Sequence, residues 1–447
     1  MTSSSKTAFV ARGFIPLGLL MFALSGSSQP LSNAWPQWRG PLANGVAPHA
    51  RPPIQWSETN NIRWKVALPG KGHSSPVVFG DRVYVLTATP VGETKPPVHD
   101  SAPGVHDSVP VTHTHHYLAL AFSRKDGRLI WKKVLREEWP HEGGHTTGSP
   151  LSNSPVTDGQ FLYAFLGSRG LYCLDTNGVV KWEKQLGRML THHAHGEGSS
   201  PVLHGDTLIV NWDHEGESFL HAFDKRTGRT LWKTPRDEKT TWSTPIIAEV
   251  AGRPQIVVSA TKRVRGYDLA TGREIWQCDG LTDNVVASPV QWRDLLIAGN
   301  SYYKQGMVAI RLTGAQGDLS TTTNVVWRLN RLTPYVPSPL LYGDTHYHIR
   351  HNQNILVRLD PATGQGRGEL LRLDGIGDFI FASPVGAAGR IYITGRDGNT
   401  VVLRHDATNA TLAVNHLDDS FSASAALADE ELYLRGERFL YCIAPPR

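Results

Sequence analysis

The chain has 447 residues, of which 40% are hydrophobic and 19% are charged, and its formal net charge is +5. This composition is ordinary for a globular protein and excludes a disordered or low-complexity chain. Because the small positive excess is spread over a large protein, the charge excludes nucleic acid from the expected partners.

Residues 1–28 are predicted to be a secretory signal peptide. Lys6 and Arg12 precede the apolar run 14–24, and small residues follow it. The run is too short to span a membrane, and the order basic, apolar, small is typical of an export signal. Ser27 stands where a lipoprotein signal has the cysteine that carries lipid. We therefore expect a periplasmic or secreted protein without a lipid anchor and without a transmembrane segment.

Residues 29–60 are rich in proline, glycine and tryptophan and show no periodicity. They predict an irregular arm over one face of the domain that follows, residues 61–447. Residues 61–68 differ from the arm, because they have the pattern of one β-strand with a tryptophan at Trp64. No other strand is predicted before this one.

The repeat unit of the domain is clearest in residues 198–235. Four short β-rich runs are separated there by turns with glycine and aspartate, as in a four-stranded antiparallel meander. A Ser-Pro pair or a close relative opens each unit, and a tryptophan lies in most fourth strands. The openings are Ser75, Ser154, Ser200, Thr244, Ser288, Ser338, Ser383 and Ser424, and the tryptophans are Trp131, Trp182, Trp232, Trp276 and Trp327.

The spacing of these units predicts an all-β fold, an eight-bladed β-propeller. From Ser154 onward the openings follow one another at steps of 41 to 50 residues, which is the period of a propeller blade. Residues 422–446 supply only three strands, so the single strand at 61–68 completes the last blade. This closure leaves no exposed sheet edge. A β-sandwich with coincidental spacing is the alternative.

Most histidines are predicted to lie on one face of the propeller. In a meander, the loop between the second and third strands and the link to the next blade emerge on the same side. The long loop 89–116, the links 136–153 and 187–199, and residues 213–215 fall there, and they hold eleven of the twenty histidines. We expect any active or binding face on this side.

The candidate site residues lie on this histidine-rich face. The candidates for binding are Glu142, Asn153, Glu197, Asp213, Glu215 and Trp242, and the candidate metal ligands are His141, His145, His192, His193 and His195. Zinc, copper and iron accept imidazole and carboxylate ligands, but the spacing matches none of the strong zinc patterns. Three alternatives stay open: a divalent-metal site, a site for a protein or another polar partner, and solvated histidines without a function.

The three cysteines give no catalytic signature. Cys173, Cys278 and Cys442 fall on strands of blades two, four and eight, too far apart for a disulfide. They are predicted to be buried thiols that behave as small hydrophobic side chains. The chain has no GxSxG elbow, Walker loop or HExxH helix, so no catalytic residue is assigned.

Four segments carry a resemblance to a known family. Residues 222–232, AFDKRTGRTLW, resemble the AxDxxTGxxxW repeat of the pyrroloquinoline-quinone-like (PQQ-like) propellers, as do residues 266–276, GYDLATGREIW, and the shorter 358–364. The segment AWPQWRGP at 34–41 resembles exported members from planctomycete-type bacteria. The family includes quinoprotein alcohol dehydrogenases and BamB, the propeller lipoprotein of outer-membrane β-barrel assembly. The resemblance spans about residues 61–446.

The resemblance implies a fold but leaves the function open. The first expectation is a monomeric, exported scaffold that binds a protein or a polar ligand, as in envelope protein assembly. The alternative is a periplasmic oxidoreductase like the quinoprotein dehydrogenases, or a metal-dependent enzyme that uses the histidine-rich face. Those dehydrogenases typically carry adjacent cysteines whose disulfide covers the quinone, and this chain has none. Tightly bound PQQ is therefore not expected.

Overall fold

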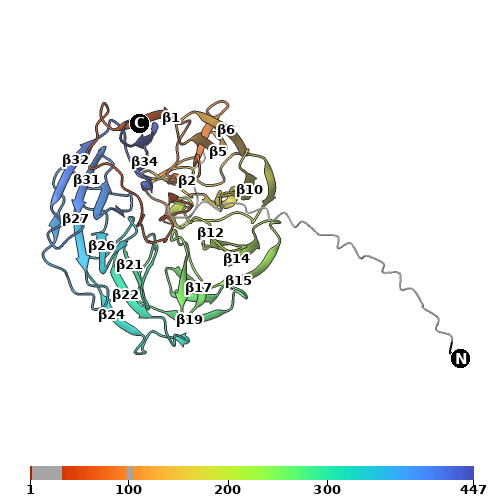
Figure 1. Cartoon of the computed structure of the whole chain (residues 1–447), viewed down its shortest axis with the longest axis vertical. Helices are drawn as coiled ribbons and strands as arrows, with labels where there is room; N and C mark the ends of the chain where they lie inside the picture. The colour runs from red at the N-terminus through yellow and green to blue at the C-terminus, as the bar shows by residue number, and fades with distance from the viewer. Residues whose placement is uncertain (3–32, 98–103, 447) are drawn as a thin grey trace.

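The computed structural model of the chain describes residues 1–2, 33–97 and 104–446. In this part of the chain, eight sheets of antiparallel strands follow one another around a ring (Figure 1). The eight-bladed β-propeller is confirmed, and the β-sandwich alternative is wrong. No helix among the described residues has the length and apolar character needed to cross a membrane. Apart from residues 1–2, the predicted signal peptide lies outside the described residues.

The first four blades each run from an inner strand at the central channel to an outer strand. Their strands are β2 Val77–Phe79, β3 Arg82–Val91, β5 Thr114–Ser123 and β6 Leu129–Glu138; β8 Val156–Thr157, β9 Phe161–Phe165, β10 Leu171–Asp175 and β11 Val180–Lys184; β12 Val202–His204, β13 Thr207–Trp212, β14 Ser218–Asp224 and β15 Thr230–Arg236; β16 Ile246–Val250, β17 Arg253–Ser259, β18 Val264–Asp268 and β19 Glu274–Cys278. Blade four also gains a parallel fifth strand, β23 Gly317–Asp318.

Blades five to eight repeat this plan. Their strands are β20 Val290–Trp292, β21 Leu295–Ser301, β22 Gln305–Arg311 and β24 Val325–Leu329; β25 Leu340–Tyr342, β26 Thr345–Ile349, β27 Ile355–Leu359 and β28 Leu371–Arg372; β29 Val385–Ala387, β30 Arg390–Thr394, β31 Asn399–Arg404 and β32 Thr411–His416; β33 Ala426–Ala428, β34 Glu431–Arg435, β35 Phe439–Ile443 and β1 Ile62–Ala67. The short strands β4 Ser108–Val109 and β7 Gly144–His145 pair outside the blades. The described residues also include the 3₁₀ turns η2 Gly167–Arg169 and η3 His192–Ala194.

The ring is closed by the N-terminal strand, as predicted. Strand β1 pairs antiparallel with β35, and Trp64 lies opposite Cys442 in this pairing. The backbone N–H of Ala444 donates to the carbonyl of Asn61 at 2.9 Å. Blade eight therefore consists of three strands from one end of the chain and one from the other.

Neighbouring blades are joined by a tryptophan that docks on a glycine turn. Trp182 of blade two donates from Nε1 to the carbonyl of Lys225 in blade three at 3.0 Å. A Cβ at Gly228, whose φ is +68°, would lie 2.8 Å from the indole, so the turn and the docked ring both require glycine. The same contact joins Trp64 to Gly127, Trp131 to Gly178, Trp232 to Gly272 and Trp327 to Gly364.

Trp276 of blade four does not dock in this way. Its Nε1 donates to Gln255 of its own blade at 2.9 Å. The corresponding turn of blade five is replaced by the longer segment 312–324, whose strand β23 pairs with the outer strand β19. The fifth strand thus joins blades four and five where the tryptophan contact is missing.

The Ser-Pro repeat builds a closed ring of hydrogen bonds around the channel. The backbone N–H of Ser75 donates to Oγ of Ser154 at 2.9 Å, and the N–H of Ser154 donates to Oγ of Ser200 at 2.9 Å. The pattern continues from blade to blade until the N–H of Ser424 donates to Oγ of Ser75 at 3.1 Å. We call this set the hydroxyl ring; its members are Ser75, Ser154, Ser200, Thr244, Ser288, Ser338, Ser383 and Ser424.

Removal of one hydroxyl from this ring is expected to destabilise the whole propeller. In Thr244→Val the side chain keeps its shape, but the buried N–H of Ser200, which donates to Thr244 Oγ1 at 3.0 Å, loses its acceptor. An unsatisfied buried donor costs about 1–3 kcal/mol, which urea unfolding can measure. Thr244→Ser keeps the hydroxyl and is the control. Equal stability of the valine and serine variants would contradict a stabilising role for the ring.

The arm before β1 lies across one end of the channel (Figure 1). Trp35 pairs through its backbone with β2, and Trp38 donates from Nε1 to Oγ of Ser288 at 3.3 Å. Arg39 is buried and donates to the carbonyl of Pro384 at 2.7 Å. Burial lowers the pKa of Arg39 to about 9. The arm therefore touches inner strands or links of blades one, five and seven.

Candidate functional site

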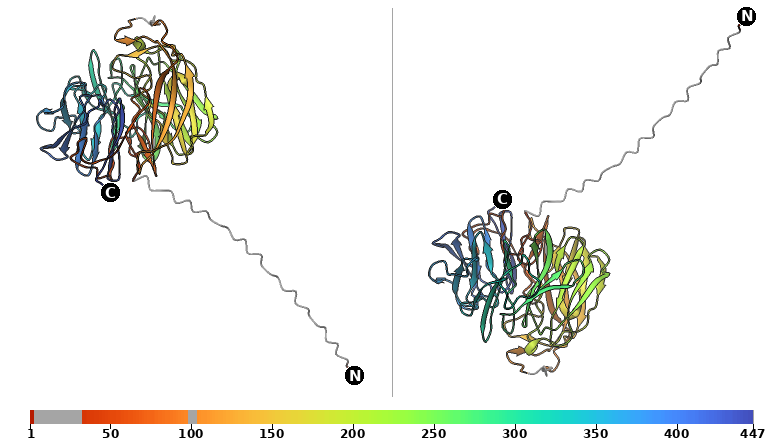
Figure 2. Two further views of the ribbon diagram at one scale, coloured as in Figure 1. Left: turned by 90° about the horizontal axis from the view of Figure 1, so that it is seen from above. Right: turned by 90° about the horizontal axis from the view of Figure 1, so that it is seen from below.

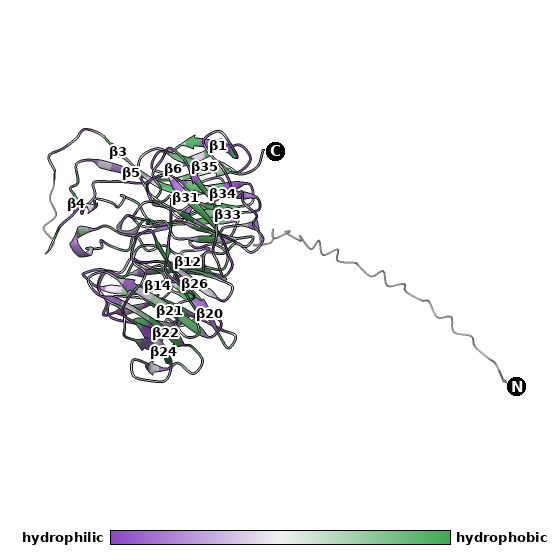
Figure 3. Cartoon of the chain, turned by 90° about the vertical axis from the view of Figure 1, so that its left-hand side faces the viewer, coloured by the Kyte–Doolittle hydropathy of each residue, from purple (hydrophilic) through white to green (hydrophobic). Residues whose placement is uncertain are grey.

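A raised pair of strands marks the face opposite to the arm (Figures 2 and 3). Strands β3 and β5 have ten residues each, and β4 from the loop between them pairs with β7 from the link to blade two. We call this structure, residues 82–97, 104–123 and 144–145, the clasp. The loop expected at 89–116 is shorter, because Thr89 pairs with His116 and Val91 with Thr114. The ladder of blade one continues into the predicted loop.

The clasp brings together four of the histidines predicted on this face. The ring centroids of His106 and His193 are 4.3 Å apart, and those of His145 and His195 are 4.5 Å apart. His195 Nε2 also bonds to the carbonyl of His106 at 3.0 Å. Among the described residues, no group of three or more histidines, cysteines or carboxylates is placed to hold a metal ion. The divalent-metal site stays a prediction.

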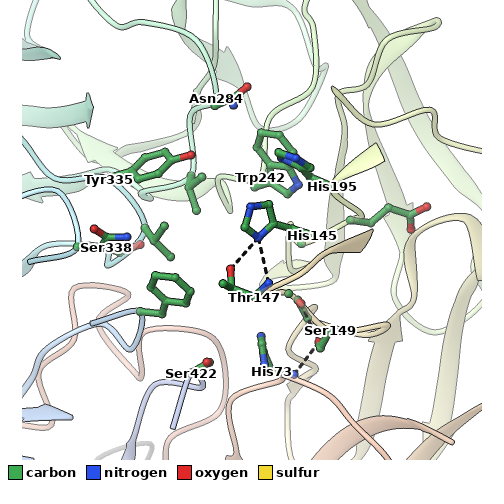
Figure 4. Close-up of a pocket in the computed structure, with 18 of the residues that line it drawn as sticks. His73, His145, Thr147, Ser149, His195, Trp242, Asn284, Tyr335, Ser338 and Ser422 are labelled. Atoms are coloured by element: carbon green, nitrogen blue, oxygen red, sulfur yellow. Dashed lines mark hydrogen bonds between the residues drawn. The ribbon is translucent and has the colours of Figure 1, made fainter. Parts of the chain in front are cut away.

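Two of these histidines are neutral groups that can donate a hydrogen bond or accept one. The backbone N–H of Thr147 donates to His145 Nδ1 at 3.1 Å, so the single proton of the neutral ring lies on Nε2 (Figure 4). Burial lowers the pKa of His145, and it lowers the pKa of His195 to about 4. At neutral pH this part of the face is therefore polar without positive charge from these two imidazoles.

A cavity of about 480 Å³ lies in the channel between the arm and the clasp (Figure 4). Trp38 of the arm lines it at one end, and members of the hydroxyl ring line its wall. Of the residues predicted from the sequence, four line the cavity: His145, His195, Glu197 and Trp242. Its size falls within the range of about 300–1,000 Å³ typical of small-molecule sites.

Three predicted residues instead hold two neighbouring links together. His141 Nε2 bonds to the carbonyl of Met189 at 2.7 Å, and Glu142 accepts the backbone N–H of Thr191 at 3.1 Å. Asn153 Nδ2 donates to the carbonyl of Ser199 at 2.6 Å. These contacts fasten the link after blade one to the link after blade two, which is a structural role.

His192 and Glu215 belong to a contact with the link that joins blades three and four. The backbone N–H of His192 donates to Thr240 Oγ1 at 2.8 Å, and Glu215 accepts the Thr240 N–H at 3.1 Å. His192 Nδ1 and a Glu215 carboxylate oxygen are 3.7 Å apart. Both side chains are partly exposed, but neither lines the large cavity.

The carboxylates of Asp213 and Glu197 each face an arginine. Asp213 accepts two hydrogen bonds from Arg236 at 2.7 and 2.9 Å, and both side chains are fully buried. Glu197 accepts the backbone N–H of Ser168 at 2.8 Å and a bond from Arg169 at 3.1 Å, both in η2. The structure thus separates Asp213 from the cavity, while Glu197 lines it with its charge already paired.

Much of the cavity wall comes from residues that sequence reasoning missed. They share no spacing with the predicted histidines and arrive from the arm and from blades one and five to seven: Trp38, His73, Asn284, Tyr302, Tyr335, Asn352, Phe379 and Phe381. No local pattern marks these residues. The members of the hydroxyl ring are different, because they belong to the Ser-Pro repeat, which can be recognised in the sequence.

The residues present do not fit pyrroloquinoline quinone. This cofactor is a tricarboxylate, and among the described residues that line the cavity none is lysine or arginine. Cys173, Cys278 and Cys442 are free and buried within the blades, as predicted, and none lines the cavity. Burial raises the pKa of their thiols to about 12, 11 and 12, respectively. The described lining therefore has neither cationic side chains to pair with the carboxylates of this cofactor nor a disulfide to cover its quinone.

Comparison with known proteins relates the chain to one family and to several solved structures. A family model described as outer membrane protein assembly factor BamB matches residues 116–369. Outer membrane protein assembly factor BamB of Shewanella oneidensis is 24% identical over 249 residues, 55% of this chain and 52% of the relative. The chain thus matches about half the length of this curated relative.

Three solved structures resemble the chain at low sequence identity. Quinohemoprotein alcohol dehydrogenase ADHIIG from Pseudomonas putida HK5 has a TM-score of 0.53 at 10% identity, covering 93% of this chain and 82% of its own. The computationally designed Ika8 protein has a TM-score of 0.52 at 11% identity, with coverages of 77% and 98%. BamB from Moraxella catarrhalis has a TM-score of 0.38 at 13% identity, with coverages of 84% and 82%. At these identities, the first two show a shared fold alone.

Proposed function

We propose that this chain, which belongs to the PQQ-like repeat family described as outer membrane protein assembly factor BamB, is a polypeptide-binding scaffold in envelope protein assembly. The family match over residues 116–369 is the observation that carries the proposal. A propeller suits such a role, because loops from many blades converge on one rigid face. The predicted export signal is consistent with a periplasmic site of action.

The clasp side supports this proposal with exposed apolar side chains. Val109, Leu190, Tyr303 and Phe379 are 50%, 56%, 77% and 62% exposed. All four lie in loops between second and third strands or in links between blades, so they share the clasp side. These side chains offer apolar contacts to a partner that docks on this side.

The proposed partner is an unfolded outer-membrane β-barrel polypeptide. In such a chain, apolar and polar side chains alternate along each future strand. Before the barrel forms, these side chains can bind to a protein face that has both apolar and polar groups. In the proposed complex, the clasp strands and Val109 contact the partner, while the arm side remains free.

A charge placed on the clasp is expected to weaken this binding. In Val109→Glu, a carboxylate replaces an apolar contact, and we expect the Kd for an unfolded outer-membrane β-barrel protein to rise about tenfold, or ~1.4 kcal/mol. Fluorescence anisotropy with the labelled, urea-diluted barrel protein measures the Kd. Val179→Glu is the matched control, because Val179 is 53% exposed in the β10–β11 turn on the opposite side. Equal Kd values for the two variants would reject the clasp as the docking surface.

A further inference from the structure

The hydroxyl ring lines the cavity with polar groups whose hydrogen-bonding capacity is only partly satisfied within the protein. Six of its members line the cavity: Ser154, Ser200, Thr244, Ser288, Ser338 and Ser424. Each oxygen accepts a backbone N–H from the preceding blade at 2.8–3.1 Å. A hydroxyl also has a proton to donate, and none of these six protons has an acceptor among the described residues. Six donors thus remain for a ligand.

The cavity disfavours an anionic ligand. Burial lowers the pKa of His73 to about 3 and that of His195 to about 4, so both rings are neutral at pH 7. Asp107 and Glu197 are the carboxylates in the described lining, and Glu197 is paired with Arg169. An anionic ligand would meet carboxylates and, among the described lining residues, neither lysine nor arginine, which makes its desolvation unfavourable.

Aromatic side chains line the clasp side of the cavity, and one of them is held in a strained conformation. Phe379 lines the cavity although its side chain is 62% exposed, and its φ is +69°. This left-handed conformation is unfavourable for a bulky side chain. The N–H of Ile380 donates to the carbonyl of Asn352 at 2.8 Å and helps to hold the segment. Strain of this kind clusters at ligand sites.

From the hydroxyl ring, the lining without lysine or arginine, and the aromatic rim, we infer that the cavity binds a neutral oligosaccharide. Sugar hydroxyls both donate and accept, as the ring hydroxyls do. The C–H face of a sugar ring is apolar and fits against the electron-rich face of an aromatic ring. The cavity offers Phe379 for this contact, and also Tyr335 and Trp242, which Figure 4 labels. This inference goes beyond the proposed function, since it concerns the cavity in the channel and a different class of ligand.

An uncharged peptide is the other occupant with comparable chemistry. A sugar is favoured for two reasons. Each sugar hydroxyl can both donate to a ring hydroxyl and accept from it, whereas in a peptide the N–H only donates and the carbonyl only accepts. Its rigid ring also offers a flat apolar face to the exposed Phe379, while a peptide must lose more conformational freedom on binding.

Calorimetric titration of the full mature chain at pH 7.5 tests the inference. The probes are neutral trisaccharides (maltotriose, cellotriose, mannotriose and tri-N-acetylchitotriose), the acidic trisaccharide of galacturonate, and an uncharged Gly-Ser-Thr-Asn-Ser-Gly peptide. We expect at least one neutral sugar to bind at one site with a Kd below about 1 mM, and the acidic sugar not to bind. Absence of binding by every neutral trisaccharide would overturn the inference, and so would binding of the peptide alone.

A variant of the strained residue separates binding from folding. Phe379→Gly removes the aromatic face and suits the positive φ, so we expect the Kd for the sugar to rise about tenfold while Tm does not fall. Tyr303→Ala is the control, because Tyr303 is an exposed aromatic residue of the same side that does not line the cavity. Equal Kd values for the two variants would overturn the inference. Neither variant alters Val109, so the clasp titration remains an independent test of the proposed function.

Discussion

A chain that begins at residue 69 is expected to aggregate instead of forming a stable monomer. Without β1, the strand β35, whose residues 440–443 are buried, becomes an open edge of blade eight. Exposed apolar edges pair with other chains. The truncation also removes Trp64, which is 7% exposed and docks on Gly127; loss of a buried tryptophan alone costs about 3–5 kcal/mol. Size-exclusion chromatography and thermal unfolding measure both effects.

A permuted chain is the control for this truncation. In the antiparallel pair, Ile62 lies opposite Ile443, so the start of β1 is next to the end of β35. A chain of residues 69–446 followed by a short Asn-Gly linker and residues 61–68 therefore restores the strand as a hairpin. It lacks the arm, as the truncated chain does, and differs only in having β1. A truncated chain as monomeric and as stable as the permuted one would contradict the closure by β1.

Removal of the Asp213 carboxylate is expected to cause the largest loss of stability of any single substitution considered for this protein. In Asp213→Ala, the guanidinium of Arg236 stays fully buried and loses both hydrogen bonds to its counter-ion. Its remaining side-chain partner is the hydroxyl of Tyr267. A buried charge deprived of its partner costs about 3–5 kcal/mol. Urea unfolding at pH 7 gives the change in free energy of unfolding.

The double variant Asp213→Ala/Arg236→Met distinguishes a structural pair from a binding residue. Because it removes both charges, we expect it to be clearly more stable than Asp213→Ala. Binding of the barrel polypeptide and of the sugar, measured on the folded double variant, should equal that of the unsubstituted protein. A stable Asp213→Ala protein that has lost binding would instead restore Asp213 to the binding face, where sequence analysis placed it.

The sequence by itself determined the fold class, the number of blades and the closure of the ring. These features depend on signals within single repeats: the Ser-Pro opening, the Asp-x-x-Thr-Gly turn and the outer tryptophan, each set by local backbone requirements. The three strands after Ser422 and the single strand around Trp64 showed which ends meet. Repetition made each local signal decisive, because eight units in phase do not arise by coincidence.

Only the tertiary structure decided which side chains meet at the channel. Trp38, Tyr335 and Phe379 are far apart in the chain and converge because the closed ring turns each blade toward one axis. Likewise, the carboxylates of Glu197 and Asp213 look alike in the sequence. Folding places Asp213 in a sealed pair with Arg236 and leaves Glu197 at the cavity wall beside Arg169. Burial and partner are properties of long-range packing, which no local pattern encodes.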